Sequence, residues 1–156
     1  MRRFVFSLQK VLDYRRRLEE QAIRDFAEAQ RQLEHERSTL ARLIALRGEC
    51  LNRSQRKHQL VVEMLDVEQN YLSVLEERIE AQRQRVAEAE RVLEERRQAL
   101  IEAQRERKTL ERLREKHYER WRQEFLRTEQ QALDDLATVR AVFQPGEMSI
   151  HVGGGE

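Results

Sequence analysis

The side chains in this sequence best suited to chemistry are histidines and a cysteine. His35, His58, His117 and His151 lie far apart, and none has a second histidine or a cysteine at the short spacing of a metal-binding motif. Cys50 has no general base near it in the sequence that could make it a nucleophile. Cys50 is the single cysteine of the chain, so it forms no internal disulfide. This is consistent with a protein of a reducing compartment.

Two other features fail as chemical sites. The run Gly153–Gly155 has no helix after it, so it lacks the geometry that cradles a phosphate. Aspartate and glutamate are abundant, but on a charged helix most of them are solvated partners of arginines three or four residues away. We therefore expect a protein that is not an enzyme, with no metal, no cofactor and no small-molecule substrate.

The composition indicates what kind of element carries these residues. Charged residues make up 38% of the 156 residues and aromatic residues 6%, with 5 Gly and 1 Pro. Before Gln144 the only helix breaker is Gly48, whereas a sheet-containing domain needs many turns. The composition predicts an all-α fold of long helices that bury a seam.

Several classes of protein are unlike this sequence. No run approaches the length of about 18 apolar residues that a membrane-spanning helix needs. Arg2 and Arg3 are not followed by the apolar stretch of a secretory signal. The formal net charge of +1 argues against a nucleic-acid partner. A peripheral membrane binder using Arg2, Arg3 and Phe4 is an alternative, although so short a basic end would touch anionic lipid weakly.

Apolar residues recur with the alternating three- and four-residue steps of a coiled coil in both halves of the chain. In the first half the seam is Phe26, Ala29, Leu33, Glu36, Leu40, Leu43 and Arg47. In the second half it is Leu75, Ile79, Gln82, Val86, Ala89, Leu93, Arg96, Leu100, Ala103, Arg107 and Leu110.

A break between the two seams predicts a hairpin. Gly48 and Asn52 interrupt the pattern, so we expect a turn at about 50–60, with Asn52 or Ser54 capping the second helix. The first helix then runs from about Ser7 to Leu51 and the second from about Gln59 to Phe143. An antiparallel coiled-coil hairpin is expected over 1–144, centred near residue 56, which puts Phe4 opposite about residue 108 and leaves the second helix overhanging. Pro145 starts a flexible tail, 145–156.

The hairpin would gather charge and aromatic side chains at its open end. Residues 1–47 carry 11 Lys+Arg against 7 Asp+Glu, residues 105–127 carry 9 against 5, and residues 128–156 carry 1 against 5. Aromatic residues join the basic ones there: Phe4, Phe6, Tyr14, Tyr118, Trp121 and Phe125. Three explanations stay open: these residues seal the fork of the hairpin, they dock an acidic or apolar partner, or a second copy covers them.

Two ordered stretches resemble a known family. The N-terminal run Phe4-Val-Phe-Ser-Leu-Gln-Lys-Val-Leu-Asp-Tyr-Arg15 resembles the opening of the flagellar export protein FliJ, an aromatic-x-aromatic-x-Leu-Gln-x-Val-Leu-x-x-Arg pattern. The runs Leu113–Tyr118 and Glu129–Ala137 are similar to the closing stretch of that family. The resemblance covers nearly the whole chain, from Phe4 to Phe143.

The resemblance implies a role in the flagellum. Members of this family are cytoplasmic coiled-coil hairpins of the flagellar type III export apparatus, similar in shape to the stalk of rotary ATPases. They sit in the central opening of the hexameric export ATPase and connect it to the export gate, a membrane protein. Some members escort empty export chaperones. The resemblance thus implies a protein associated peripherally with the cytoplasmic side of the membrane at the flagellar base.

Two sets of residues follow. The basic open end, which resembles the part that enters the ATPase ring, offers Arg15, Arg16, Arg17, Arg112, Arg114 and Trp121. The resemblance places gate contacts at Glu36, Leu40, Leu43, Arg47, Tyr71, Leu75, Arg78 and Gln82. Leu43 and Arg47 stand where family members often carry aromatics, and ordinary hairpin packing is the alternative for this patch. The alternative for the whole protein is a generic structural coiled-coil scaffold or homodimer.

Overall fold

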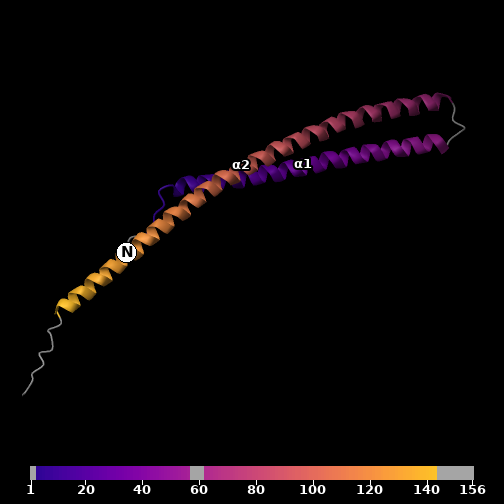
Figure 1. Ribbon diagram of the computed structural model, residues 1–156. Coiled ribbons are helices and arrows are strands. Elements are labelled where there is room, and N and C mark those ends of the chain that lie inside the picture. The colour runs from indigo at the N-terminus through magenta and orange to yellow at the C-terminus, as the bar shows by residue number, and fades with distance from the viewer. Residues whose placement is uncertain (1–2, 57–61, 144–156) are drawn as a thin grey trace, which may run out of the picture. The chain divides into compact units, whose positions relative to one another are not determined.

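Two long helices make up the protein in the computed structural model, which describes residues 3–56 and 62–143 (Figure 1). Helix α1 is Gln9–Arg56 and helix α2 is Val62–Phe143. Within the described ranges there is no strand. The predicted all-α fold is confirmed, and α2 extends to Phe143, the last residue described.

The predicted end of the first helix is wrong, because α1 continues past Leu51 to Arg56. Gly48 has nothing within 4 Å of the position of a side chain, so it costs α1 only the propensity difference of about 1 kcal/mol. The Ser54 hydroxyl donates to the Cys50 carbonyl at 3.2 Å and contacts a Glu68 carboxylate oxygen at 3.0 Å. Asn52 and Ser54 therefore lie inside α1 and do not cap α2.

The predicted turn at about 50–60 lies partly within α1. Residues 50–56 are helical, so they are not in a turn. The rest of the predicted turn, the predicted start of the second helix at Gln59 and the tail from 145 to 156 lie outside the described residues.

The chain divides into two compact units. The hairpin unit is Leu8–Leu110, and the terminal unit combines Met1–Ser7 with Glu111–Glu156. Helix α2 supplies residues to both units.

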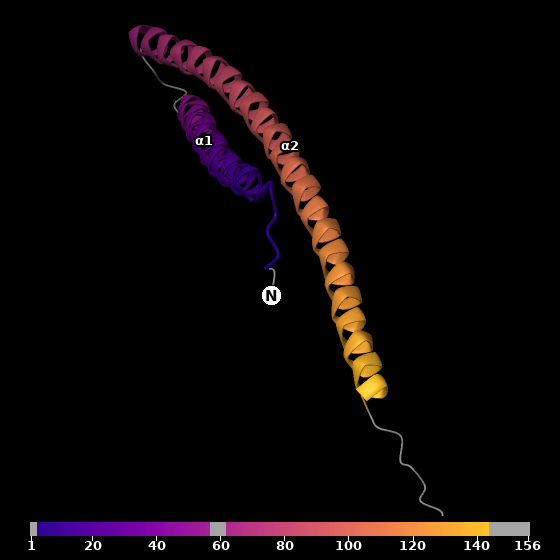
Figure 2. The same cartoon turned by 90° about the vertical axis from the view of Figure 1, so that its left-hand side faces the viewer.

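In the hairpin unit the two helices lie side by side and run in opposite directions (Figure 2). Contacts between them join Ser54 to Glu68, Arg37 to Glu90, Asp25 to Arg96 and Arg15 to Glu106. The partner number rises as the α1 number falls, which defines an antiparallel pair. The core between the helices includes Leu12, Ala29, Leu33, Leu75, Ile79 and Ala89, as a heptad seam requires.

The pairing is shifted from the predicted register. The pairs Ser54–Glu68 and Arg15–Glu106 both have their midpoint near residue 61, five residues later than the predicted centre at 56. The reason is the longer α1: since the helix does not stop at Leu51, its partner residues on α2 all move toward the C-terminus. The prediction that placed Phe4 opposite residue 108 fails for the same reason, as the contacts of Phe4 show below.

In the terminal unit, the short segment before α1 accompanies α2 over the residues that are described. Phe6 in that segment is buried, whereas every α2 residue from Leu126 to Phe143 is exposed. The second helix thus overhangs, as predicted. Neither α1 nor α2, over the part of the chain that is described, has an apolar stretch sufficient to span a bilayer.

Candidate functional site

An aromatic cluster is the most distinctive feature of the terminal unit. Tyr118, Trp121 and Phe125 follow one another at spacings of three and four residues, which puts them on one face of α2. The Trp121 ring stacks on Tyr118 at 5.8 Å between centroids and on Phe125 at 5.4 Å. Phe4 meets the edge of Tyr118 at 5.3 Å and lies 5.8 Å from Trp121.

These contacts correct the predicted position of Phe4. It lies against residues 118 and 121, about ten positions beyond the predicted residue 108. Phe6 reinforces the same segment through an edge contact with His117, at 5.6 Å between ring centroids. His117, one of the histidines first considered for chemistry, therefore has a packing role here. Tyr14, expected beside these aromatics, belongs to the hairpin unit, where the Arg15 guanidinium lies 6.0 Å from its ring centroid.

The cluster is only partly covered. Trp121 and Phe125 are half-buried, and Tyr118 is exposed. The contacts of Phe4 support the sealing explanation, because Phe4 covers one side of Trp121. The exposed Tyr118 ring and the half-buried Phe125 ring leave part of the apolar surface of the cluster accessible. A partner could bury that surface.

Basic side chains around this cluster have no ion-pair partner among the described residues. They are Arg112, Arg114, Lys116, Arg120, Arg122 and Arg127. All of them are exposed. An exposed cation without a partner retains its field, which can attract an acidic surface.

Four of these cations share one face of α2. Arg112, Lys116 and Arg120 follow at four-residue steps, and Arg127 lies two turns further along the same face. Arg120 and Arg127 flank a shallow groove that Gln123 and Glu124 also line. We call these four residues the basic ridge. The prediction from sequence included Arg112 and missed the other three. The four-residue spacing was the signal that could have found them.

The predicted ATPase-docking residues are divided between the two units. Arg112, Arg114 and Trp121 lie in the terminal unit, and Arg15, Arg16 and Arg17 lie in the hairpin unit. Arg15 forms an ion pair with Glu106, and Arg16 approaches Asp13 at 3.8 Å. Arg17 is exposed and has no ion pair within the ranges described.

The predicted gate-contact residues lie in the hairpin unit and differ in exposure. Leu75 and Gln82 retain 2% and 4% of their accessible surface. The Gln82 amide nitrogen donates to the Glu36 backbone carbonyl at 3.0 Å and to its carboxylate at 2.5 Å. These three residues therefore hold the helices together. The other members of the set are half-buried on α1, namely Leu40, Leu43 and Arg47, or exposed on α2, namely Tyr71 and Arg78.

Ion pairs in the hairpin unit form both between the two helices and within α2. Arg107 and Glu19 form an ion pair across the helices with side chains 22% and 12% exposed. On the surface, Arg91 donates to Glu88 at 2.5 Å, and this hydrogen bond lowers the pKa of the Glu88 carboxyl and raises that of Arg91. Over the described residues, no three histidine, cysteine, aspartate or glutamate side chains converge on a possible metal position.

Comparison with known proteins gives one match. The family model described as the flagellar FliJ protein matches residues 4–145 of the chain, which includes both helices and the aromatic cluster. No curated protein and no solved structure matches the chain.

Proposed function

Because the chain belongs to the flagellar FliJ protein family, which implies a role related to flagellar export, we propose that it is a non-enzymatic stalk and adaptor of the type III export apparatus. It docks in the ring of the hexameric export ATPase and links that ring to the cytoplasmic domain of the export gate. It is cytoplasmic and associates peripherally with the membrane at the flagellar base. Escort of export chaperones is a further activity of the same protein.

The proposal of ATPase docking rests on exposed arginines in the terminal unit that have no ion-pair partner among the described residues. Arg112 and Arg114 are exposed and have no ion-pair partner among the described residues, and the half-open aromatic cluster lies on the same segment of α2. Cations that are free to pair, next to apolar surface that is free to be buried, form the combination that an acidic and apolar partner site recognises.

For the export gate, the proposal rests on the exposed members of the predicted set. Tyr71 is 50% exposed and Arg78 is exposed on the same helix, so both are available to a partner. Leu75 and Gln82, in contrast, contribute by keeping α1 and α2 in register beneath that surface.

The test of the docking proposal is binding to the purified export ATPase, with and without nucleotide, at low and high salt. Replacing both arginines in an Arg112→Glu/Arg114→Glu variant should weaken binding about tenfold at low salt, and the loss should shrink at high salt because salt screens exposed charges. The matched control is Arg83→Glu/Arg85→Glu, which makes the same charge change at exposed positions of the hairpin unit.

The control variant should bind like the unaltered chain. Binding that neither these reversals nor salt affects would contradict docking through the terminal unit. A chain that does not bind the ATPase at all would contradict the proposed stalk function.

A further inference from the structure

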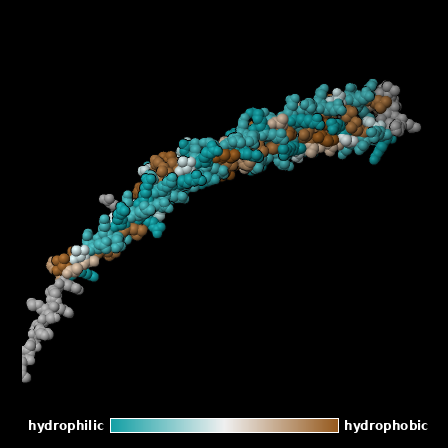
Figure 3. All heavy atoms as spheres, viewed as in Figure 1, coloured by the Kyte–Doolittle hydropathy of each residue, from teal (hydrophilic) through white to brown (hydrophobic). Residues whose placement is uncertain are grey.

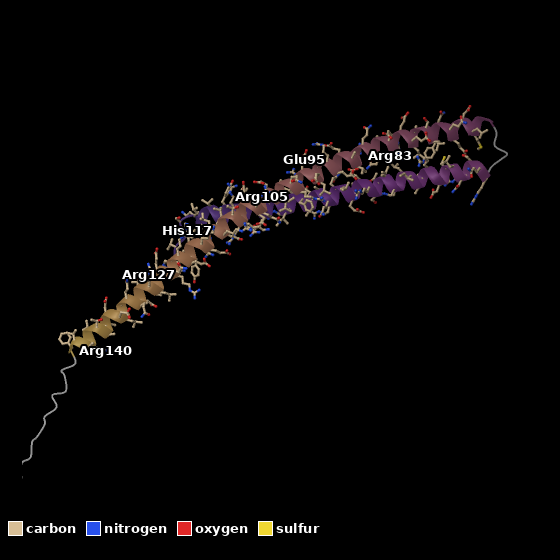
Figure 4. The ribbon with its side chains drawn as sticks, viewed as in Figure 1. Arg83, Glu95, Arg105, His117, Arg127 and Arg140 are labelled. Atoms are coloured by element: carbon tan, nitrogen blue, oxygen red, sulfur yellow. The ribbon has the colours of Figure 1, made fainter. Side chains whose placement is uncertain are left out.

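The last turns of α2 expose an apolar face with nothing described against it. Leu126, Leu133, Leu136 and Phe143 are 53%, 61%, 61% and 80% exposed. Hydrophobic residues are visible at this end of the molecule in Figure 3, and the side chains near the labels Arg127 and Arg140 stand out from a single helix in Figure 4. An apolar face of this kind marks an interaction surface.

The spacing of this face is that of a coiled-coil seam. Steps of three, four, three, four and three residues connect Leu126, Glu129, Leu133, Leu136, Arg140 and Phe143. We call these six residues the terminal seam. Ala132 and Val139 flank it with small apolar side chains, whereas Arg127, Asp134 and Asp135 lie off it.

The terminal seam has the same spacing read in either direction. If a second copy lies antiparallel, with the two-fold axis between Asp134 and Asp135, Leu126 faces the partner's Phe143 and Leu133 faces the partner's Leu136. The same alignment sets Glu129 opposite the partner's Arg140, twice in the symmetric pair. A two-fold interface requires this kind of self-complementarity.

Charge selects the orientation. A parallel pair would place Glu129 against another Glu129 and Arg140 against another Arg140, and like charges at a seam oppose association. The antiparallel pair joins opposite charges at both positions. Neither Glu129 nor Arg140 has an ion-pair partner within the described part of its own chain, so both are free to make this contact.

We propose that the terminal seam, residues 126–143 of α2, binds the same seam of a second copy of this chain in an antiparallel coiled coil. The contact uses residues other than Arg112, Arg114 and Trp121, so it does not depend on the proposed ATPase docking. A seam of only six positions gives a weak dimer, with a dissociation constant on the order of 100 µM.

Sedimentation equilibrium of the full chain, from about 10 µM to about 1 mM, tests the proposal. The unaltered chain should self-associate. The single variants Glu129→Arg and Arg140→Glu each create two like-charge contacts and should weaken association at least about tenfold. The double variant Glu129→Arg/Arg140→Glu restores opposite charges and should recover it. An equimolar mixture of the two single variants should also associate, since each supplies the charge that the other lacks.

Matched controls are Arg127→Glu and Asp135→Arg, which make the same charge changes on the same exposed helix off the seam. They should associate like the unaltered chain, and circular dichroism should show the same helix content for every variant. A chain that stays monomeric up to about 1 mM overturns the proposal. So does a double variant that fails to recover, or an apolar face that proves to bind the export ATPase in a monomeric chain.

Discussion

The hairpin unit and the terminal unit contain similar charged and apolar side chains, but several of those in the hairpin unit are paired across its two helices. In the hairpin unit, cations meet carboxylates across the helices, as Arg37 meets Glu90 and Arg107 meets Glu19. In the terminal unit, Arg112 and Arg114 have no such partner among the described residues. The apolar residues differ likewise: Leu75 is buried in the hairpin unit, and Leu133 is exposed in the terminal unit.

This difference teaches how a two-helix protein can separate stability from binding. Seam residues and interhelical ion pairs in the hairpin unit satisfy one another, so substitutions there should act on folding. Charged and aromatic side chains in the terminal unit remain accessible, so substitutions there should change the affinity for partners. Single substitutions in each unit can test this separation.

Leu75→Ala should have the largest effect on the free energy of unfolding. The side chain is 2% exposed, and removing most of it from a closed seam costs about 2–5 kcal/mol. Chemical denaturation followed by circular dichroism measures this loss. Binding to the export ATPase, assayed at a temperature where the variant is still folded, should be unchanged because no residue of the terminal unit is altered.

The control for that variant is Val67→Ala, in the same unit and helix but 68% exposed. It should change the free energy of unfolding by less than about 0.5 kcal/mol. Equal losses from the two variants would mean that the seam is not the source of stability in the hairpin unit.

The sequence predicted the helices and the seam but not the register between them. The three- and four-residue periodicity identified Leu33, Leu75, Ile79 and Ala89 as seam residues, and all four are buried. Periodicity is a local property, so it survives an error in the turn. The pairing of distant residues depends on where the chain turns, and Gly48 looks the same in sequence whether a helix ends there or continues through it.

The error in the predicted register also affected the prediction for the candidate site. A centre five residues too early left Trp121 without a partner from the N-terminal segment, whereas Phe4 in fact lies beside it. Lys116, Arg120 and Arg127 of the basic ridge were missed for another reason. Exposed arginines and lysines are common along the whole chain, and only the structure shows which of them lack a carboxylate partner.

Trp121→Ala should have the next largest effect, which is on the affinity for the export ATPase. Tryptophan is enriched among residues that dominate interfaces, and its truncation there costs about 2 kcal/mol or more. The melting temperature should barely change, because the ring contacts of Trp121 with Phe4, Tyr118 and Phe125 all lie within the terminal unit. As the 1 tryptophan in the sequence, it also reports binding of the unaltered chain through its fluorescence.

Both quantities are measured on the same variant. A lower melting temperature with unchanged affinity for the ATPase would show that Trp121 only seals the N-terminal segment against α2. That outcome would mean that the terminal unit has a small core of its own.

Glu19→Gln should have a moderate effect on stability. It leaves the Arg107 guanidinium, which is 22% exposed, without the charge of its interhelical partner. Removing one member of a buried pair is costly, but partial exposure lets water compensate, so we expect a loss of about 1–2 kcal/mol. The control Glu20→Gln changes the neighbouring exposed carboxylate and should be neutral. A neutral Glu19→Gln would contradict the view that interhelical charges stabilise the hairpin unit.

The smallest effect belongs to the surface pair Glu88–Arg91, which lies on α2 in the hairpin unit but does not cross to α1. The hydrogen bond from Arg91 lowers the pKa of the Glu88 carboxyl below its ordinary value. A carboxyl with a lowered pKa in the folded state stabilises the fold above its unfolded pKa and loses that contribution as the pH falls through the folded pKa. In Arg91→Gln, an NMR titration should find the Glu88 pKa raised toward its ordinary value, with no measurable change in melting temperature at neutral pH, since exposed pairs contribute little. A clear drop in melting temperature would show that charges within one helix, and not only those across the hairpin, set the stability of this unit.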